Sequence, residues 1–213
     1  MLSHRRQEIC LAAALTGVAG AVDAIGFLSL GGFFVSFMSG NTTRAGVALA
    51  AGDLSDFWLA AGLIVSFVIG VITGSVVGHR AGVRRRAVVL GFVALVLAAS
   101  FAMSVPDVTV FIAAPLLAVA MGAENAVFEA DGEVRIGLTY MTGTLVKMGQ
   151  NIAQRVMGTS QPATWPRHGA LWAGMAAGAC LGGGTYELIG FASVACAAAL
   201  TAIAAIVVIV LDL

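Results

Sequence analysis

The stretch "FMSGNTTRAG", residues 37–46, places an amide, three hydroxyls and an arginine inside a long apolar part of the chain. A near copy, "YMTGTLVKMG", occupies residues 140–149. Polar side chains are costly where a chain is surrounded by lipid, so each stretch needs a structural or functional reason. Because the stretch occurs twice, that reason bears on the organisation of the whole chain.

The composition is that of an integral membrane protein. Of the 213 residues, 60% are hydrophobic and 10% are charged, and the mean hydropathy is +0.99. A soluble domain has about a quarter charged residues, so this chain has too little polar surface to cover a globule in water. The lipid bilayer is the predicted partner, and a formal net charge of zero gives no indication of nucleic-acid binding. The three cysteines lie in apolar runs without metal-ligand spacing, and we expect them to be small buried residues.

Four charge-free apolar stretches are candidates to cross a bilayer, which takes roughly 20 residues of helix. Two further regions, residues 9–52 and 108–157, are long enough but contain charged and amide side chains. The order is one interrupted region and two uninterrupted stretches, and this order occurs twice. The uninterrupted stretches are residues 57–78, 87–105, 169–186 and 188–211.

This order predicts an all-α, polytopic membrane protein with an internal duplication at an offset of about 103 residues. We expect a single membrane domain, 1–213, with one repeat at about 9–105 and the other at about 108–211. The match of "AVDA" with "AENA" and the match of "MSGNT" with "MTGTL" support the duplication. The matched segments are residues 21–24 with 123–126 and residues 38–42 with 141–145.

A glycine ladder in each half is the third match. Small residues at every fourth position lie on one face of a helix and allow a second helix to approach closely. We therefore assign the ladders to helix packing, within the chain or in a homo-oligomer. They consist of Gly70, Gly74 and Gly78 in the first half and Gly174, Gly178 and Gly182 in the second.

Arginine placement favours repeats of opposite orientation, because cytoplasmic loops have an excess of Lys and Arg. Two arginine clusters lie on either side of the first interrupted region: the pair Arg5 and Arg6, and the loop "HRAGVRRR", residues 79–86. Both can be cytoplasmic only if that region crosses the membrane once. Each repeat then makes three crossings, and the second repeat is inverted. The alternative counts each interrupted region as two full helices, which gives eight crossings and parallel repeats but leaves one arginine cluster outside.

A single crossing made from some forty residues cannot be one straight helix. Backbone in hydrocarbon must be hydrogen-bonded internally unless it is buried in protein or lines a wet cavity. Adjacent glycines in "SLGGFF", residues 29–34, weaken a helix. We expect a helix to about Phe27, non-helical backbone between about residues 29 and 38, and a short helix from about Ser39. A weaker counterpart is expected at residues 129–140.

Three stretches resemble the YoaK family of bacterial membrane proteins, a domain-of-unknown-function family. They are "DAIGFLSLGGFFVSFMSGNTTRAG" (23–46), "AMGAENA" (120–126) and "TYMTGTLVKMG" (139–149), and the resemblance covers nearly the whole chain. It implies a multi-pass protein of the bacterial cytoplasmic (inner) membrane, and it implies no particular reaction. In the family we expect glutamine before the second-half asparagine, whereas this chain has Glu124 there.

Four charged side chains fall at membrane depth in this organisation, where each isolated charge costs about 2.5–3.5 kcal/mol on insertion scales. Their signs balance within each repeat, so one hypothesis is two buried ion pairs, Asp23 with Arg44 and Glu124 with Lys147. In that case the hydroxyls and amide of "SGNTT" cap a helix, since Ser, Asn and Thr are preferred at N-caps. Alternatively, the two cations extend to an interface.

The functional hypothesis is a small-solute or ion transporter or channel with a midplane site between the two signatures. Inverted repeats bring discontinuous helices together there, and their ends bind the solute or ion. Arg44 and Lys147 would favour an anion, while Asp23 and Glu124 could carry a proton. The candidate binding residues are Asp23, Ser39, Gly40, Asn41, Thr42, Arg44, Glu124, Asn125, Thr142, Gly143, Thr144 and Lys147.

A non-catalytic membrane scaffold or partner subunit is the alternative, and in it the polar motifs are structural. The sequence contains no P-loop, HExxH or GxSxG motif and no cysteine–histidine cluster. We therefore predict no enzymatic activity, no cofactor and no metal. The sequence does not identify the solute, the coupling ion or the direction of transport.

Whole-cell labelling of single cysteines with a membrane-impermeant thiol reagent tests the predicted topology. In a background that lacks the three native cysteines, we expect a cysteine at position 187 to react from outside and one at position 84 to remain unlabelled. The first position lies in a predicted external turn, and the second lies in the arginine-rich loop. External labelling at position 84 would contradict the inverted-repeat arrangement.

Overall fold

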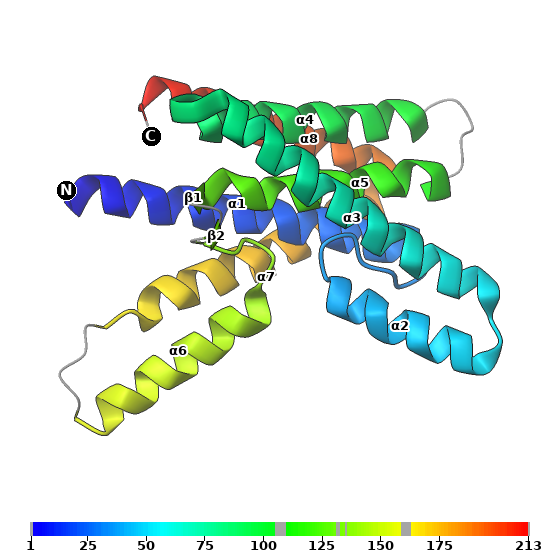
Figure 1. The fold of residues 1–213 in the computed structure, drawn as a ribbon, viewed down its shortest axis with the longest axis horizontal. Coiled ribbons are helices and arrows are strands. Elements are labelled where there is room, and N and C mark those ends of the chain that lie inside the picture. Colours follow the sequence, from blue (N-terminus) through cyan, green and yellow to red (C-terminus); the bar gives the residue numbers. More distant parts are fainter. Residues whose placement is uncertain (1, 105–109, 131–132, 135, 159–162, 213) are drawn as a thin grey trace.

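The computed structural model describes residues 2–104, 110–130, 133–134, 136–158 and 163–212 (Figure 1). Helices account for nearly all of this part of the chain, and two-residue strands form one antiparallel pair. The long elements are α1 (Leu2–Ser29), α2 (Met38–Ala51), α3 (Leu54–Ala81), α4 (Arg85–Ser104), α5 (Val110–Glu124), α6 (Met141–Val156), α7 (Trp165–Ile189) and α8 (Ser193–Val210). The short elements are the 3-10 helices η1 (Gly82–Arg84), η2 (Asn125–Phe128) and η3 (Gly190–Ala192), with β1 (Glu129–Ala130) and β2 (Glu133–Val134).

Three stretches of helix are long and apolar enough to cross a bilayer: Gln7–Ser29, Leu54–Ser104 and Trp165–Val210. The second stretch contains α3 and α4, and the third contains α7 and α8. The four uninterrupted stretches of the sequence correspond to these four helices. The prediction of an all-α membrane protein is thus confirmed, while the expected junction between the repeats, residues 105–108, lies outside the described residues.

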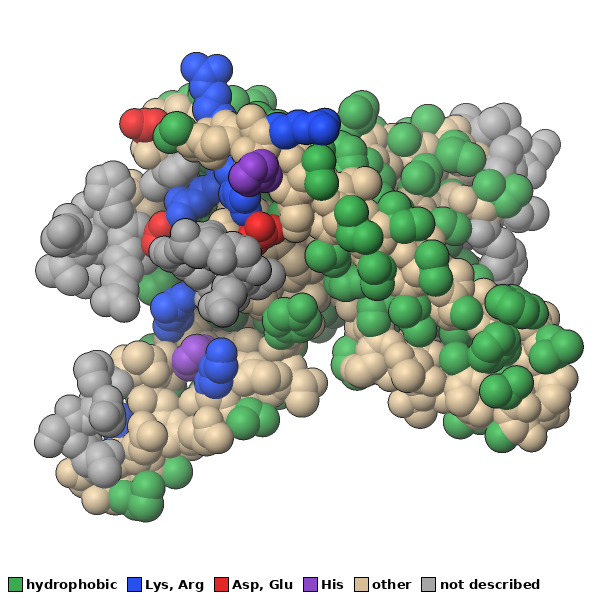
Figure 2. Space-filling model, in the orientation of Figure 1, with side chains coloured by type: hydrophobic (Ala, Val, Ile, Leu, Met, Phe, Trp, Pro, Cys, Tyr) green, Lys and Arg blue, Asp and Glu red, His purple; other side chains and the backbone are tan. Residues whose placement is uncertain are grey.

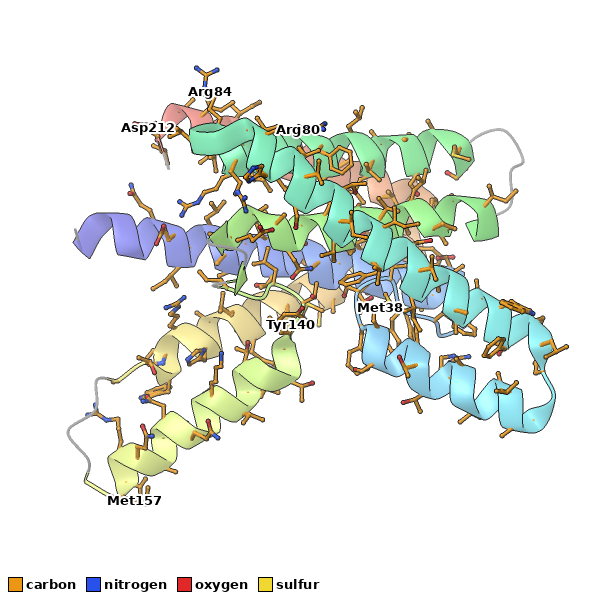
Figure 3. All side chains as sticks on the ribbon, viewed as in Figure 1. Met38, Arg80, Arg84, Tyr140, Met157 and Asp212 are labelled. Atoms are coloured by element: carbon orange, nitrogen blue, oxygen red, sulfur yellow. The ribbon has the colours of Figure 1, made fainter. Side chains whose placement is uncertain are left out.

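Each long helix packs against a helix from the other half of the chain. α1 lies along α7, α3 lies along α5, and α4 lies along α8. The short helices pack within their own half, α2 on α3 and α6 on α7. Figure 1 shows both chain termini at the same end of the molecule, and Figure 3 places Arg84 at that end as well.

The glycine ladders lie where these helices touch. A Cβ atom at Gly70 would overlap the carbonyl oxygen of Val119 in α5, and a Cβ atom at Gly178 would overlap the carbonyl oxygen of Gly17 in α1. A Cβ atom at Gly74 would come within 2.6 Å of the Cα atom of Ala123. Backbone-to-backbone contact of this kind needs residues without side chains, so the glycines determine how close the helices come.

Two side chains cap helices near the ends of the short helices. Asp53, the N-cap of α3, accepts hydrogen bonds from the backbone N–H groups of Asp56 and Ser55, each at 3.1 Å. The bond from Asp56 lowers the pKa of the Asp53 carboxyl. Asn151 of α6 accepts bonds from the backbone N–H groups of Thr164 and Trp165, both at 2.9 Å. The second cap fastens α6 to the first turn of α7.

Charged side chains gather at the end of the molecule that holds the termini (Figure 2). Arg85 of α4 lies 3.2 Å from the carboxylate of Glu129 in β1 and donates to the Glu129 carbonyl at 3.0 Å. Ser75 of α3 donates to the same carboxylate at 2.6 Å, and Arg86 forms an ion pair with Glu8 of α1 at 2.5 Å. These contacts, which we name the charged-end cluster, link α1, α3, α4 and β1.

The expectation that the cysteines are buried is wrong. Cys10, Cys180 and Cys196 are all exposed on the protein. An apolar side chain has no reason to avoid the surface of a protein that faces lipid, so hydrophobic character does not predict burial here.

A Gly178→Ala substitution tests the helix contact between α1 and α7. We expect it to lower the stability of the purified protein by about 1–3 kcal/mol, because the added methyl group forces the two backbones apart. Thermal unfolding in detergent measures the change. Gly184 is the matched control, since a Cβ atom there meets nothing within 4 Å; Gly184→Ala should be neutral or up to about 1 kcal/mol more stable. Equal effects at both positions would contradict the packing role.

Candidate functional site

The break predicted in the first interrupted region is confirmed. α1 ends at Ser29 and α2 begins at Met38, which leaves residues 30–37 outside any helix. Gly31 and Gly32 have φ angles of 65° and 96°, a region in which a side chain would be strained and glycine is not. The glycine pair therefore ends α1 and turns the chain toward the start of α2.

Backbone groups of this break need partners, because an unpaired N–H or C=O group away from water costs as much as a lost hydrogen bond. The first groups extend the end of α1: Leu30 donates to the Gly26 carbonyl at 2.9 Å, and Gly32 donates to the Phe27 carbonyl at 2.8 Å. Several of the remaining groups bond to three side chains, Asp23, Asn41 and Arg44. We call these three residues the break clamp.

Asp23 reaches the break from α1. Its Oδ1 atom accepts hydrogen bonds from the backbone N–H of Val35 at 2.8 Å and from that of Ser36 at 2.7 Å. The Asp23 side chain is buried, with 7% of the residue exposed. A carboxyl oxygen that accepts two N–H bonds fixes both donors in place.

Asn41 reaches the break from α2 and is fully buried. Its Nδ2 atom donates to the Phe34 carbonyl at 2.6 Å, and its Oδ1 atom accepts from the Phe34 N–H at 3.0 Å. The side-chain amide thus pairs with both polar groups of one residue, as one strand pairs with its neighbour in a sheet. Gly40 beside it leaves room for the ring of Phe37, which a Cβ atom would approach to 2.5 Å.

Arg44 completes the clamp from the next turn of α2. Its guanidinium donates to the Gly32 carbonyl at 2.8 Å and to the Gly31 carbonyl at 3.3 Å, and it lies 4.0 Å from the centre of the Phe33 ring. These carbonyls directly follow the C-terminus of α1, where a cation is favoured by the helix dipole.

Two sequence-based interpretations of this segment are wrong. Asp23 and Arg44 do not form an ion pair with each other, since each bonds to backbone groups of the break; the nearest carboxylate to Arg44 is that of Asp56, at 3.9 Å. The hydroxyls and amide of "SGNTT" do not cap α2 either, because the N-cap residue is Phe37 and it forms no side-chain cap bond. Ser39 and Thr42, two of the three hydroxyl-bearing residues of the stretch, are exposed.

The second interrupted region is also broken. After α5 ends at Glu124, the chain forms η2, β1 and β2, and α6 begins at Met141, so the described residues between 129 and 140 contain no helix. Asn125 donates to the Met121 carbonyl at 3.0 Å and accepts from the Thr139 hydroxyl at 3.3 Å. In the matched segments Asn125 corresponds to Asp23, and at the offset of 103 residues Thr139 corresponds to Ser36.

Among the described residues of the second unit, the rest of the clamp has no equivalent. Thr144, which matches Asn41, is buried but donates its hydroxyl to the Tyr140 carbonyl at 3.1 Å, within its own helix end. Lys147, which matches Arg44, is exposed, as are Thr142 and Gly143.

The proposed ion pair between Glu124 and Lys147 is wrong as well. Glu124 is fully buried, and neither of its carboxyl oxygens has a hydrogen-bond partner within the described chain. Lys147 remains at the surface. Matching charge signs in sequence therefore did not identify the partners of any of the four charged residues.

A hollow separates the two short helices. Figure 2 shows the surface indented between the lobe that carries α6 and the lobe that carries α2. Figure 3 places Met38 and Tyr140, at the starts of these helices, on either side of this indentation. We call it the α2–α6 hollow and define it by the first turns of the two helices, residues 38–42 and 140–144. The helices diverge from it toward opposite ends of the molecule.

A cavity of about 630 Å³ lies elsewhere, between α1, α7 and α8. Its lining is apolar along most of its length and includes Leu15, Val18 and Leu200, and neither signature contributes to it. Because it is open and apolar within a membrane protein, it has the character of a lipid-facing groove and not of a site for a polar solute.

Sequence reasoning missed two groups that position the short helices. Asn151 lies in the interrupted region, but nothing in the pattern indicated that it caps a helix beginning at Trp165. Glu129 was seen only as part of the second break, although it is the acceptor of the charged-end cluster. One signal could have indicated this role of Glu129: the arginine-rich loop, residues 79–86, contains cations that need acidic partners.

These features define a multi-pass, all-α membrane protein with two helix breaks. The chain belongs to the family described as "Protein of unknown function (DUF1275)", whose model matches residues 11–207, so the resemblance noted in the sequence is confirmed.

Two relatives support the same assignment. The chain is similar to the UPF0700 transmembrane protein RA0705 of Rhizobium meliloti (strain 1021), with 40% identity over 184 residues, which is 85% of this chain and 78% of the relative. It is also similar to the UPF0700 transmembrane protein YoaK of Bacillus subtilis (strain 168), with 28% identity over 157 residues, 70% of this chain and 69% of the relative. No solved structure matches the chain.

An Asn41→Ala substitution tests the break clamp. We expect it to lower stability by about 1–3 kcal/mol for each of the two Phe34 backbone groups that it leaves unpaired. Thr43 is the control, because its hydroxyl is exposed and bonds only to its own helix, at the Ser39 carbonyl; Thr43→Ala should change stability by less than about 0.5 kcal/mol. Thermal unfolding of both purified variants decides the matter, and an unchanged Asn41→Ala protein would rule out the clamp.

Proposed function

We propose that the protein is a transporter or channel for a small solute or ion, with its site in the α2–α6 hollow. The observation that carries the proposal is the exposure of polar groups at the first turns of both short helices, among them Ser39, Thr42 and Thr142. Polar side chains at membrane depth are unfavourable against lipid and are found facing a bundle interior or a water-filled cavity. A hollow with such groups on both sides fits a polar pathway.

The proposal includes inverted repeats of three crossings each. In the proposed duplication α1 to α4 correspond to α5 to α8 in order. The α1–α7 contact then corresponds to the α5–α3 contact, the α2–α3 contact to the α6–α7 contact, and the α4–α8 contact to itself. All of these contacts occur. A pseudo-two-fold axis would produce this pattern. α2 and α6 have 14 and 16 residues, fewer than the roughly 20 that a full crossing takes, which supports six crossings over eight.

In the mechanism that we infer, the first unit is a fixed support and the second unit moves. The break clamp ties α2 to the end of α1 through Asp23, Asn41 and Arg44. The matching positions in the second unit, Thr144 and Lys147, form no comparable bonds to the second break in the described part of the chain. Rocking of α6 and the second break against the first unit would open the hollow to one side of the membrane and then the other.

A scaffold or partner subunit is the second candidate function. One observation favours it: the charged and amide groups of the first signature bond to the backbone of their own chain, so these three residues are already explained structurally. If the protein is a scaffold, another protein would have to cover the exposed polar first turns of α2 and α6.

Flux into liposomes tests the proposal. Purified protein is reconstituted and challenged with concentration jumps of chloride, phosphate, sodium and potassium ions and of urea and glycerol, with protein-free liposomes as the blank. We expect flux of at least one probe, and we expect Thr142→Trp to abolish it, because the indole would fill the hollow at an exposed position where folding is undisturbed. Ile206→Trp, at a 59% exposed position of α8, is the control and should leave the flux intact.

Two results would count against transport. Flux that survives Thr142→Trp would exclude the α2–α6 hollow as the pathway. Absence of flux for every probe, in protein that unfolds cooperatively, would favour the scaffold.

A further inference from the structure

Glu124 is a carboxyl group without a partner in the interior of a membrane protein. It is the last residue of α5, its exposed fraction is 0%, and neither carboxyl oxygen forms a hydrogen bond within the part of the chain that the structure describes. Met121, Ala123 and Ala126 near it in sequence are buried and apolar, and Asn125, which follows it, is buried and uses its amide to bond to Met121 and Thr139. The position is therefore dry and low in dielectric constant.

Glu129, five residues further along, has the opposite surroundings. Its carboxylate accepts a hydrogen bond from the Ser75 hydroxyl at 2.6 Å and lies 3.2 Å from Arg85. These two contacts lower the pKa of Glu129, so it is ionised. In its described part, the chain thus provides a cation and a hydroxyl for Glu129 and neither for Glu124.

Among the side chains that the structure describes, those of the elements packed on α5 and η2 form no ion pair with Glu124. Asp23 bonds to the first break, Arg85 to Glu129, and Arg86 to Glu8. The ionisable residues on these elements are His4, Arg5, Arg6, Glu8, Cys10 and Asp23 of α1, Asp56, His79 and Arg80 of α3, Arg85 and Arg86 of α4, and Glu133 of β2.

An ionised carboxylate in such a place is strongly disfavoured. Burial of an unpaired charge away from water is far more costly than burial of a neutral acid, and the group responds by binding a proton. The C-terminus of α5 adds partial negative charge beside it, which disfavours a carboxylate further.

We propose that Glu124 is a proton-binding site whose protonation is coupled to the conformation of the described end of the second break, residues 136–140, which the Thr139 hydroxyl links to Asn125, the residue after Glu124. The neutral acid holds the break closed against α5. When the break opens, water reaches the carboxyl group; its O–H bond breaks, the proton passes to water as hydronium, and the carboxylate remains hydrated. Reclosure requires the reverse transfer. This inference rests on the proposed function in one respect only, in that it makes the proton the coupling ion.

The matched position in the first half of the chain has no carboxyl group. Val22 corresponds to Glu124 in the matched segments "AVDA" and "AENA", and it is fully buried and apolar. The first break, which the clamp fastens, has no ionisable group at that position, whereas the second break has one.

Infrared spectroscopy of the purified protein in lipid tests protonation directly. We expect the spectrum of the wild type minus that of Glu124→Gln to contain the carbonyl stretching band of a protonated carboxyl group at neutral pH. Glu187→Gln removes an exposed carboxyl group and is the control; its difference spectrum should lack that band. Glu124→Met, an apolar replacement of similar length, serves if the glutamine variant does not fold. A difference spectrum without the band overturns the proposal.

Hydrogen exchange of residues 136–140 tests the coupling. After correction for the intrinsic pH dependence of amide exchange, we expect these amides to exchange faster in alkaline than in acidic buffer in the wild type and in Glu187→Gln. In Glu124→Gln the corrected rates should not depend on pH. Corrected rates that are pH-independent in the wild type, or equally pH-dependent in Glu124→Gln, would reduce Glu124 to a neutral structural residue and overturn the coupling.

These measurements do not depend on transport. Absence of flux in liposomes would overturn the proposed function and leave the proton site standing. Flux together with a missing carboxyl band would overturn the proton site alone.

Discussion

Non-helical backbone inside a membrane protein must find its hydrogen-bond partners within the protein, and the first signature supplies them. Residues 30–37 lie outside any helix, and bilayer hydrocarbon offers no water to bond them. Asp23 accepts from two of their N–H groups, Asn41 pairs with Phe34, and Arg44 donates to the carbonyls of the glycine pair. The amide and the arginine within the apolar stretch are thus extensions of the backbone's own hydrogen bonding.

The helices beside the breaks interleave with helices of the other half, since α1 lies along α7 and α3 lies along α5. Glycine at positions such as Gly70 and Gly178 lets α3 reach α5 and α7 reach α1 with backbones in contact. Each half of the chain is therefore covered by the other half, and the packing and the breaks depend on one another.

The sequence was sufficient for the helices and for the positions of the breaks, because apolar run length and adjacent glycines act locally. It was insufficient for the partners of the charged residues. Equal and opposite charges in each repeat suggested ion pairs, yet Asp23 and Arg44 each bond to backbone groups. Backbone groups become available as partners only where the chain leaves the helix, and neither composition nor residue spacing predicts which side chain they bond to. The cap at Asn151 was missed for the same reason, since its acceptor role depends on where α7 begins.

The differences between the two signatures carry as much information as their likeness. An amide that can both donate and accept, Asn41, is matched by a single hydroxyl at Thr144, and the planar donor group of Arg44 is matched by an exposed lysine. Each change removes the geometry that fastens a short helix to its break. Beside Asn125, which matches Asp23, the chain has Glu124 where the first half has Val22. The charge of the Glu124 carboxyl group depends on the access of water. This difference fits the proposed mechanism, in which the first unit is the support and protonation of Glu124 acts on the second unit.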